Sequence, residues 1–235
     1  MISTERERMS SAERMGSVLN GEKPDRVPFI PFSYGFAALL AGFDIGDFYL
    51  DPEKSFRAQM LCKEILKHDG NPLFSYASFG AWEFGGKIRF PSSEWDQAPI
   101  VIQPAVASPE DVETLKVPTV ETAGYLPSEI CFLKLAASQG LPIFVKLGTP
   151  FTTAGTVIGE ELMLRWMIKR PDLVHKVLRK VVEFYIHIAH YFVKEYGAER
   201  LVAFEGAPSE ASDLISPQQF EEFALPYLLE THQKI

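Results

Sequence analysis

Four short apolar segments separated by helical patterns constrain the fold of this chain more than any other feature. They lie at residues 27–32, 72–78, 141–148 and 201–205. The last one, LVAFE, is apolar without alternation up to its final glutamate, as is typical of a strand that is covered on both faces. Strands that alternate with helices favour right-handed βαβ units. The sequence therefore predicts an α/β fold in which four strands are parallel neighbours in chain order.

The segments between these strands read as helices with recognisable ends. Pro52 lies in the first turn of a helix over 52–68, and Gly197 ends a long helix over 171–196. The stretches GKIRFP and APIVIQP, on either side of residues 92–97, instead predict a β-hairpin. Further helices are expected over 10–19, 127–138 and 160–169 and from 217 onward, with a helical turn at 108–111.

Four parallel strands allow two closures: an open doubly wound sheet, or the first half of an eight-stranded (β/α)8 TIM barrel. No G-x-G-x-x-G or G-x-x-x-x-G-K-[ST] motif follows a strand, which weakens the case for the open sheet. In a barrel the active site gathers at the C-terminal ends of the strands. The side chains expected at these ends are Ser33, Tyr34, Ser75, Tyr76, Lys146, Thr149, Thr152 and Glu205.

Composition excludes several classes of partner. The chain is 46% hydrophobic with a formal net charge of -8, and its Lys and Arg residues are scattered, so neither nucleic acid nor an anionic membrane surface is an expected partner. The charged start of the chain does not resemble a signal peptide, which favours the cytoplasm. Cys62 and Cys131 lie far apart in helical patterns, and both are expected to be reduced core residues.

Three segments resemble the uroporphyrinogen decarboxylase superfamily in order and spacing: GEKPDRVPFIPF at 21–32, GTPFTTAGTVIGEE at 148–161 and DLISPQQFEEFALPYL at 213–228. The resemblance spans the chain and implies a (β/α)8 barrel, as a single domain over 1–235 that lacks the C-terminal part of the barrel. A half barrel leaves its outer strands without lateral partners. Exposed edges, or pairing with another chain as in a homodimer, are therefore expected.

The resemblance also separates two branches of this superfamily. In the decarboxylases an RQAGR motif follows strand one, and its arginines would bind substrate carboxylates; the matching stretch here is SYGFA at 33–37. The decarboxylase motif FSD matches Phe74, Ser75 and Tyr76, and its later tyrosine aligns with Thr156. A tetrapyrrole with eight carboxylates needs a cationic pocket, whereas these strand ends offer chiefly Lys146. Porphyrinogen decarboxylation is therefore disfavoured.

By elimination, the resemblance implies a methyltransferase that moves a methyl group between a small methylated compound or thiol and a corrinoid on a partner protein. In that branch zinc lowers the pKa of a thiol and makes it a nucleophile. The usual zinc ligands, an H-x-C pair and a later cysteine, are absent here and normally lie beyond residue 235. Uroporphyrinogen decarboxylase itself, a lyase without a cofactor, is the alternative. A non-catalytic binding or scaffold member is the third interpretation.

Glu205 and Tyr76 are the catalytic candidates. Glu205 is expected to point into the barrel mouth and to share one pocket with Lys146, where it would support a metal or bind substrate; the alternative is a solvated strand-end carboxylate. Packing is the alternative for Tyr76 and Tyr34, and extension to a neighbouring loop is the alternative for Lys146. Substrate-binding roles are expected for Ser33, Tyr34, Ser75, Lys146, Thr149 and Thr152. Glu183, His187 and His190 have a spacing that could hold zinc, but they lie on an outer helix, which favours a structural role.

Overall fold

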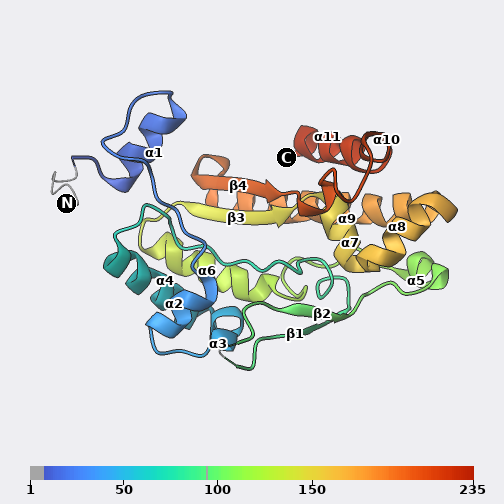
Figure 1. Ribbon diagram of the computed structural model, residues 1–235, viewed down its shortest axis with the longest axis horizontal. Coiled ribbons are helices and arrows are strands. Elements are labelled where there is room, and N and C mark those ends of the chain that lie inside the picture. The colour runs from blue at the N-terminus through green and yellow to red at the C-terminus, as the bar shows by residue number, and fades with distance from the viewer. Residues whose placement is uncertain (1–7, 94) are drawn as a thin grey trace.

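The computed structural model describes residues 8–93 and 95–235, so the first seven residues of the charged start of the chain lie outside the described residues. Two parallel strands, β3 (Ile143–Gly148) and β4 (Leu201–Gly206), lie at the centre with helices packed around them (Figure 1). They pair without a register shift, from Ile143 opposite Leu201 to Gly148 opposite Gly206. The predicted parallel arrangement is confirmed for this pair.

A second, smaller sheet is the predicted hairpin. Strands β1 (Lys87–Arg89) and β2 (Ile100–Gln103) pair antiparallel, with a register irregularity beside Lys87. In Figure 1 this hairpin lies on the far side of the helical layer from β3 and β4. It is thus an excursion from the barrel architecture and contributes no strand to the central pair.

The predicted helices form close to their expected bounds. Ser10 and Glu13 form a capping box at the first helix, and the Asp51 side chain accepts hydrogen bonds from the first turn of the helix at residue 52. None of the described helices is long and apolar enough to cross a membrane. The confirmed helices are α1 (Ser11–Leu19), α4 (Pro52–Leu66), α5 (Pro109–Thr114), α6 (Leu126–Ser138), α8 (Glu160–Lys169) and α9 (Pro171–Tyr196).

The final predicted helix is continuous but changes its winding. It consists of α10 (Pro217–Gln219), a π-helical turn η3 (Phe220–Ala224) and α11 (Leu225–Lys234). Pro226 has no N–H to donate to a carbonyl one turn earlier, and the wider π turn ends two residues before it. Elements that the sequence did not predict are α2 (Tyr34–Leu40), α3 (Ile45–Leu50), α7 (Pro150–Ile158) and the 3₁₀ turns η1 (Ala198–Arg200) and η2 (Pro208–Glu210).

The predicted strands at 27–32 and 72–78 are wrong, because neither segment forms a strand in the described residues. Side chains engage backbone groups that a β-ladder would otherwise use. Gln59 accepts from the Leu73 N–H at 2.8 Å and donates to the Leu73 carbonyl at 3.0 Å. Asp69 likewise accepts from the Phe29 N–H at 2.9 Å. Both segments therefore follow the predicted path without regular strand pairing.

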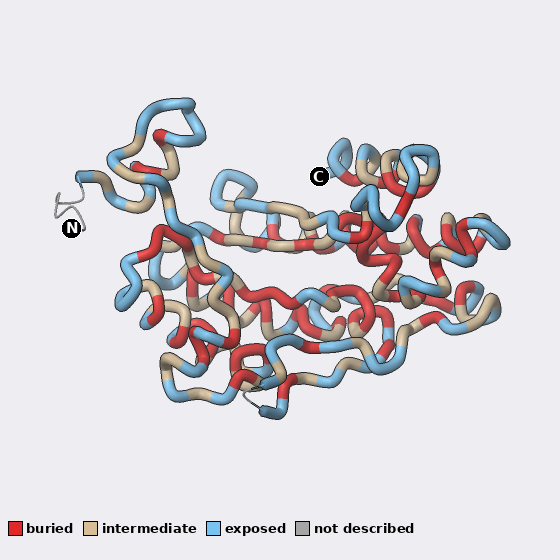
Figure 2. Tube along the Cα trace, in the orientation of Figure 1, coloured by how far each residue is buried: buried red, intermediate tan, exposed pale blue. Residues whose placement is uncertain are grey.

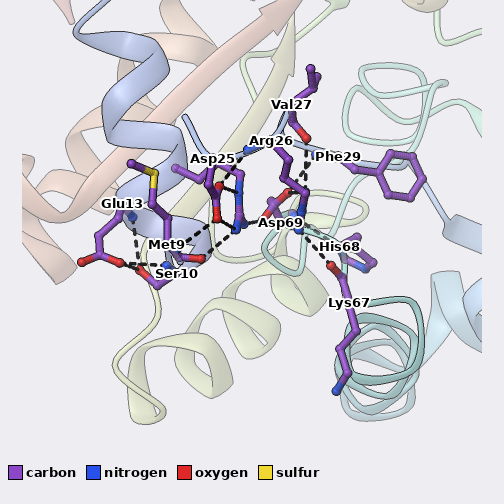
Figure 3. Close-up of polar contacts among 12 residues, drawn as sticks. Met9, Ser10, Glu13, Asp25, Arg26, Val27, Phe29, Lys67, His68 and Asp69 are labelled. Carbon is purple, nitrogen blue, oxygen red and sulfur yellow. Dashed lines mark hydrogen bonds and ion pairs between the residues drawn. The ribbon is translucent and has the colours of Figure 1, made fainter. Parts of the chain in front are cut away.

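Asp69 links three parts of the chain (Figure 3). Its fully buried carboxylate forms ion pairs with Arg14 of α1 and with Arg26, the latter at 2.5 Å. Burial opposes ionisation of Asp69, but the hydrogen bonds from the Phe29 N–H and from both arginines outweigh it and lower the pKa to about 2. This carboxylate thus fixes α1 and the 26–29 segment against the end of α4.

We expect Asp69→Asn to lower the free energy of unfolding at pH 7 by about 3 kcal/mol, because it removes the buried carboxylate charge that pairs with both Arg14 and Arg26. The pKa of Asp69 is lower in the folded state than in the unfolded state. Its contribution is therefore present above about pH 4 and is lost as the pH falls through about 2. Urea unfolding of wild type and variant between pH 2 and pH 7 measures both effects.

Asp47→Asn is the matched control, since the Asp47–Lys54 ion pair is partly exposed and should contribute little. An Asp69→Asn protein as stable as the control variant would contradict the role assigned to Asp69.

Candidate functional site

The two faces of the β3–β4 pair carry different chemistry. Side chains alternate along β3, so buried Val145 and Leu147 face one way while half-buried Phe144 and Lys146 face the other. Figure 2 shows buried and exposed parts of the chain in the same orientation as Figure 1. Lys146 pairs in register with Phe204. We call the face with Phe144, Lys146 and Phe204 the inner face, and the opposite face the outer face.

The inner face brings together three residues that the sequence predicted as substrate-binding. Lys146 Nζ donates a hydrogen bond to the Tyr34 hydroxyl at 3.4 Å, and that hydroxyl lies 3.4 Å from Ser75 Oγ. Lys146 Nζ also lies 5.5 Å from the centre of the Phe32 ring, which stacks on Tyr34. The expected convergence of these strand-end residues is therefore present in the structure.

A cavity of about 230 Å³ lies against this inner face. Aromatic side chains from distant parts of the chain form much of its wall, and Ser33 and Tyr34, at the start of α2, lie on its edge. We call it the inner cavity. Its lining residues are Met15, Ile30, Pro31, Phe32, Ser33, Tyr34, Gln59, His68, Asp69, Gly70, Asn71, Pro72, Leu73, Phe144 and Phe204.

Tyr76 is held away from this cavity by a buried carboxylate. Its hydroxyl donates to both carboxylate oxygens of Glu83 at 2.8 Å, and the N–H groups of Gly80 and Tyr125 donate to the same carboxylate. Burial and the neighbouring Glu83 charge raise the pKa of Tyr76 well above its usual value. The structure therefore gives Tyr76 a neutral, structural phenol, and it supports packing over the catalytic interpretation.

A second buried glutamate lies near this pair without hydrogen-bond donors of its own. Glu129 on α6 is 2% exposed, and its Oε1 has no partner among the described residues; the hydroxyl of buried Tyr125 also has none. Burial, reinforced by the nearby Glu83 charge, raises the pKa of Glu129 well above its usual value. Burial inside the helical layer therefore favours the protonated form of Glu129.

Thr149 and Thr152 are engaged by a carboxylate that the sequence did not single out. Thr149 caps α7 by accepting from the Thr152 N–H at 3.3 Å, and both threonine hydroxyls donate to Glu210, at 2.6 Å for Thr152. Glu210 lies in the η2 turn that follows β4, so this contact joins the C-terminal ends of the two strands. The sequence feature that could have identified Glu210 is its position five residues after Glu205, in the loop of small residues that follows β4.

The expected placement of Glu205 is wrong. Glu205 is in register with Leu147, so it projects from the outer face, opposite to Lys146. There it pairs with His232 of α11 at 2.7 Å, at the edge of a separate groove of about 650 Å³ between the strands, α9 and α11. Glu205 therefore shares no pocket with Lys146, because adjacent positions on a strand point to opposite faces.

The remaining candidate residues do not lie together in a site. Glu183, His187 and His190 are exposed along α9, and in the part of the chain that the structure describes no three His, Cys, Asp or Glu side chains gather as metal ligands. The zinc implied by the resemblance thus finds no ligand set among these residues. Cys62 is buried as expected, whereas Cys131 is only half-buried; both are free thiols.

Residues 10–235 match the family described as uroporphyrinogen decarboxylase (URO-D). The chain belongs to the URO-D family. A solved methyltransferase from Methanosarcina mazei shares the fold, with a TM-score of 0.78 and 19% identity over 97% of this chain and 68% of that one. The fold is thus of the predicted α/β, (β/α)8 TIM-barrel type, although only β3 and β4 form regular barrel strands in the described residues.

Curated relatives come from both branches of the URO-D family. The methylated-thiol–coenzyme M methyltransferase of Methanosarcina mazei is 34% identical over 142 residues, which are 57% of this chain and 36% of the relative. The uroporphyrinogen decarboxylases of Schizosaccharomyces pombe and Homo sapiens are 26% and 29% identical, each over 54% of this chain. The matched segments span 36% and 35% of those decarboxylases, so each comparison covers about a third of the relative.

We expect Glu129→Gln to make the protein more stable than wild type at pH 8 by at least about 1 kcal/mol. The pKa of Glu129 is higher in the folded state than in the unfolded state, so wild-type stability falls as the pH rises above about 4.5. The glutamine keeps the shape but has no proton to lose. Unfolding free energies from pH 5 to pH 8 test this, with exposed Glu121→Gln as control; identical pH profiles for wild type and Glu129→Gln would contradict it.

Proposed function

We propose that the protein is a methyltransferase of the URO-D superfamily that moves a methyl group between a small methylated compound or thiol and a corrinoid on a partner protein. The observation that carries the proposal is the inner face, where one cation, Lys146, lies beside Tyr34 and Ser75. The higher identity to the methyltransferase than to the two decarboxylases supports the same branch.

The same geometry disfavours uroporphyrinogen decarboxylation. The arginines that the resemblance places after the first strand of a decarboxylase are replaced by SYGFA, and Arg14 and Arg26 are bound to Asp69. The inner cavity, at about 230 Å³, is below the range of about 300–1,000 Å³ that is usual for drug-sized ligands. A tetrapyrrole with eight carboxylates would leave most of its charges unpaired, at a cost of several kcal/mol for each buried charge.

The side chains of the inner face can bind and orient a small substrate. Lys146 supplies a positive charge, and the hydroxyls of Tyr34 and Ser75 supply groups that donate and accept hydrogen bonds. The pairing of Thr149 and Thr152 with Glu210 fixes the loops at the C-terminal ends of β3 and β4. Zinc and a corrinoid are the groups that the resemblance implies for this reaction, and the described residues offer no set of zinc ligands.

The test is an assay of methyl transfer from methylcobalamin to coenzyme M and to a panel of small thiols, followed by cobalamin absorbance and by mass spectrometry of the thioether. We expect protein-dependent transfer, and we expect Tyr34→Phe to lower its rate about threefold to tenfold through the loss of one hydrogen bond to Lys146. Tyr191→Phe, on α9 and away from the inner cavity, serves as the matched control.

A parallel assay with uroporphyrinogen separates the alternatives. Formation of decarboxylated porphyrinogens would replace the proposal with the lyase interpretation. Inactivity in both assays, together with retained binding of a corrinoid protein, would favour a non-catalytic binding or scaffold role.

A further inference from the structure

A groove on the outer face of the β3–β4 pair is separate from the inner cavity. It holds about 650 Å³ and lies between the two strands, α9 and α11; we call it the outer groove. Alternate residues of β4, from Leu201 through Ala203 to Glu205, form part of its floor and span about 13 Å at about 3.3 Å per residue. The volume lies within the range of about 300–1,000 Å³ that is usual for small-molecule sites. The groove therefore has room for an elongated small molecule.

Most of the lining of the outer groove is apolar, and part of it is open to solvent. Leu147 of β3 and Phe192 of α9 are buried at its walls, whereas Ala203 of β4 and Val193 of α9 are exposed. Apolar surface that stays open to solvent in a concave site gains free energy when an apolar body covers it. The greater part of a ligand for this groove is therefore apolar.

Negative charge gathers at one end of the outer groove, where the two strands end. Glu205 lines the groove, and Glu210 accepts a hydrogen bond from Thr149, which lines it too. Burial raises the pKa of the nearby Tyr185 phenol on α9, and the charges of Glu205 and Glu210 raise it further. In residues 8–93 and 95–235 neither carboxylate forms an ion pair with a lysine or an arginine. This end of the groove thus suits a positively charged group.

His232, which contacts Glu205 in the structure, leaves room for such a group. Its Nε2 lies 2.7 Å from Glu205 Oε2, and the imidazole side chain is 59% exposed, while that of Glu205 is 19% exposed. Histidine is a cation only when it is protonated, and an ion pair with an exposed partner contributes little. Among the described residues Glu205 Oε1 accepts no hydrogen bond. A mostly buried carboxylate that has a free oxygen and no permanent cation favours a ligand that donates a charged hydrogen bond.

From these contacts we infer that the outer groove binds an amphiphilic amine, with its ammonium group on Glu205 and its alkyl or ring body along β4 toward Leu201. The site lies on the face of the strands opposite to Lys146 and goes beyond the proposed methyl transfer. Spread over about 13 Å, the volume gives a cross-section of about 50 Å², which is smaller than that of a helix about 10 Å wide. The ligand is therefore a free small molecule and not a helix of a partner protein.

Isothermal titration calorimetry with n-octylammonium, octan-1-ol and octanoate tests this inference on the 235-residue chain. The probes share one alkyl chain and differ in the charge of the head group. We expect n-octylammonium to bind wild type at least about tenfold more tightly than octan-1-ol does, because a hydrogen bond between charged groups is stronger than a neutral one. Octanoate should bind more weakly than octan-1-ol, since Glu205 and Glu210 repel its carboxylate.

Three variants assign the preference to Glu205. Glu205→Gln keeps the shape of the side chain but removes its charge, and it should weaken n-octylammonium about tenfold while leaving octan-1-ol unchanged. Glu183→Gln, on the exposed side of α9 and outside the groove, is the matched control and should bind all the probes as wild type does. His232→Ala removes the group that competes for Glu205 and should bind n-octylammonium at least as tightly as wild type does.

A fourth variant locates the site. Ala203→Phe fills the middle of the outer groove and should abolish binding of all the probes. Thermal unfolding of each variant checks that the protein is folded before binding is compared.

Equal binding of n-octylammonium and octan-1-ol to wild type, tighter binding of octanoate, or an unchanged preference in Glu205→Gln would overturn the inference. Absence of binding by every probe, or full binding by a folded Ala203→Phe protein, would overturn it as well. None of these outcomes bears on the methyl-transfer assay, because Glu205 and Lys146 lie on opposite faces of the strands.

Discussion

The in-register parallel pairing of β3 and β4 is the constraint on which the site depends. It places Lys146 beside Phe204 on the inner face and Glu205 beside Leu147 on the outer face. Because side chains alternate along a strand, a shift of one residue would exchange these two faces and bring the carboxylate to the cavity. A shift of β3 by one residue would take Val145 and Leu147 out of the buried layer, which opposes it.

Polar side chains on the wall of the inner cavity form hydrogen bonds to other groups of the protein. The carboxylate of Asp69 and the amide of Gln59 both hydrogen-bond to backbone or side-chain partners inside the chain. Such fully paired networks fix the loops around a cavity and leave it mainly apolar. Lys146 is different, because its described neighbours are a phenol and an aromatic ring and none of them is a carboxylate.

Membership of the URO-D family accounts for the fold but does not decide between the methyltransferase branch and the decarboxylase branch. The family contains relatives that act on thiols and relatives that act on a tetrapyrrole. In our proposal the choice between them rests on the single lysine beside Tyr34 and on the small inner cavity, which fit a small substrate better than a large polyanion.

The sequence by itself determined the helices with clear caps, the hairpin, the parallel β3–β4 pair and the meeting of Tyr34, Ser75 and Lys146. These follow from local signals and from the rule that parallel strands end at one edge. Only the tertiary structure decided the rest. It revealed α7, which is buried on nearly all sides and so lacks an amphipathic pattern, and it replaced two expected strands with segments held by side chains. It also turned Glu205 outward, because the direction of a strand-end side chain depends on register against a neighbour that is distant in the chain.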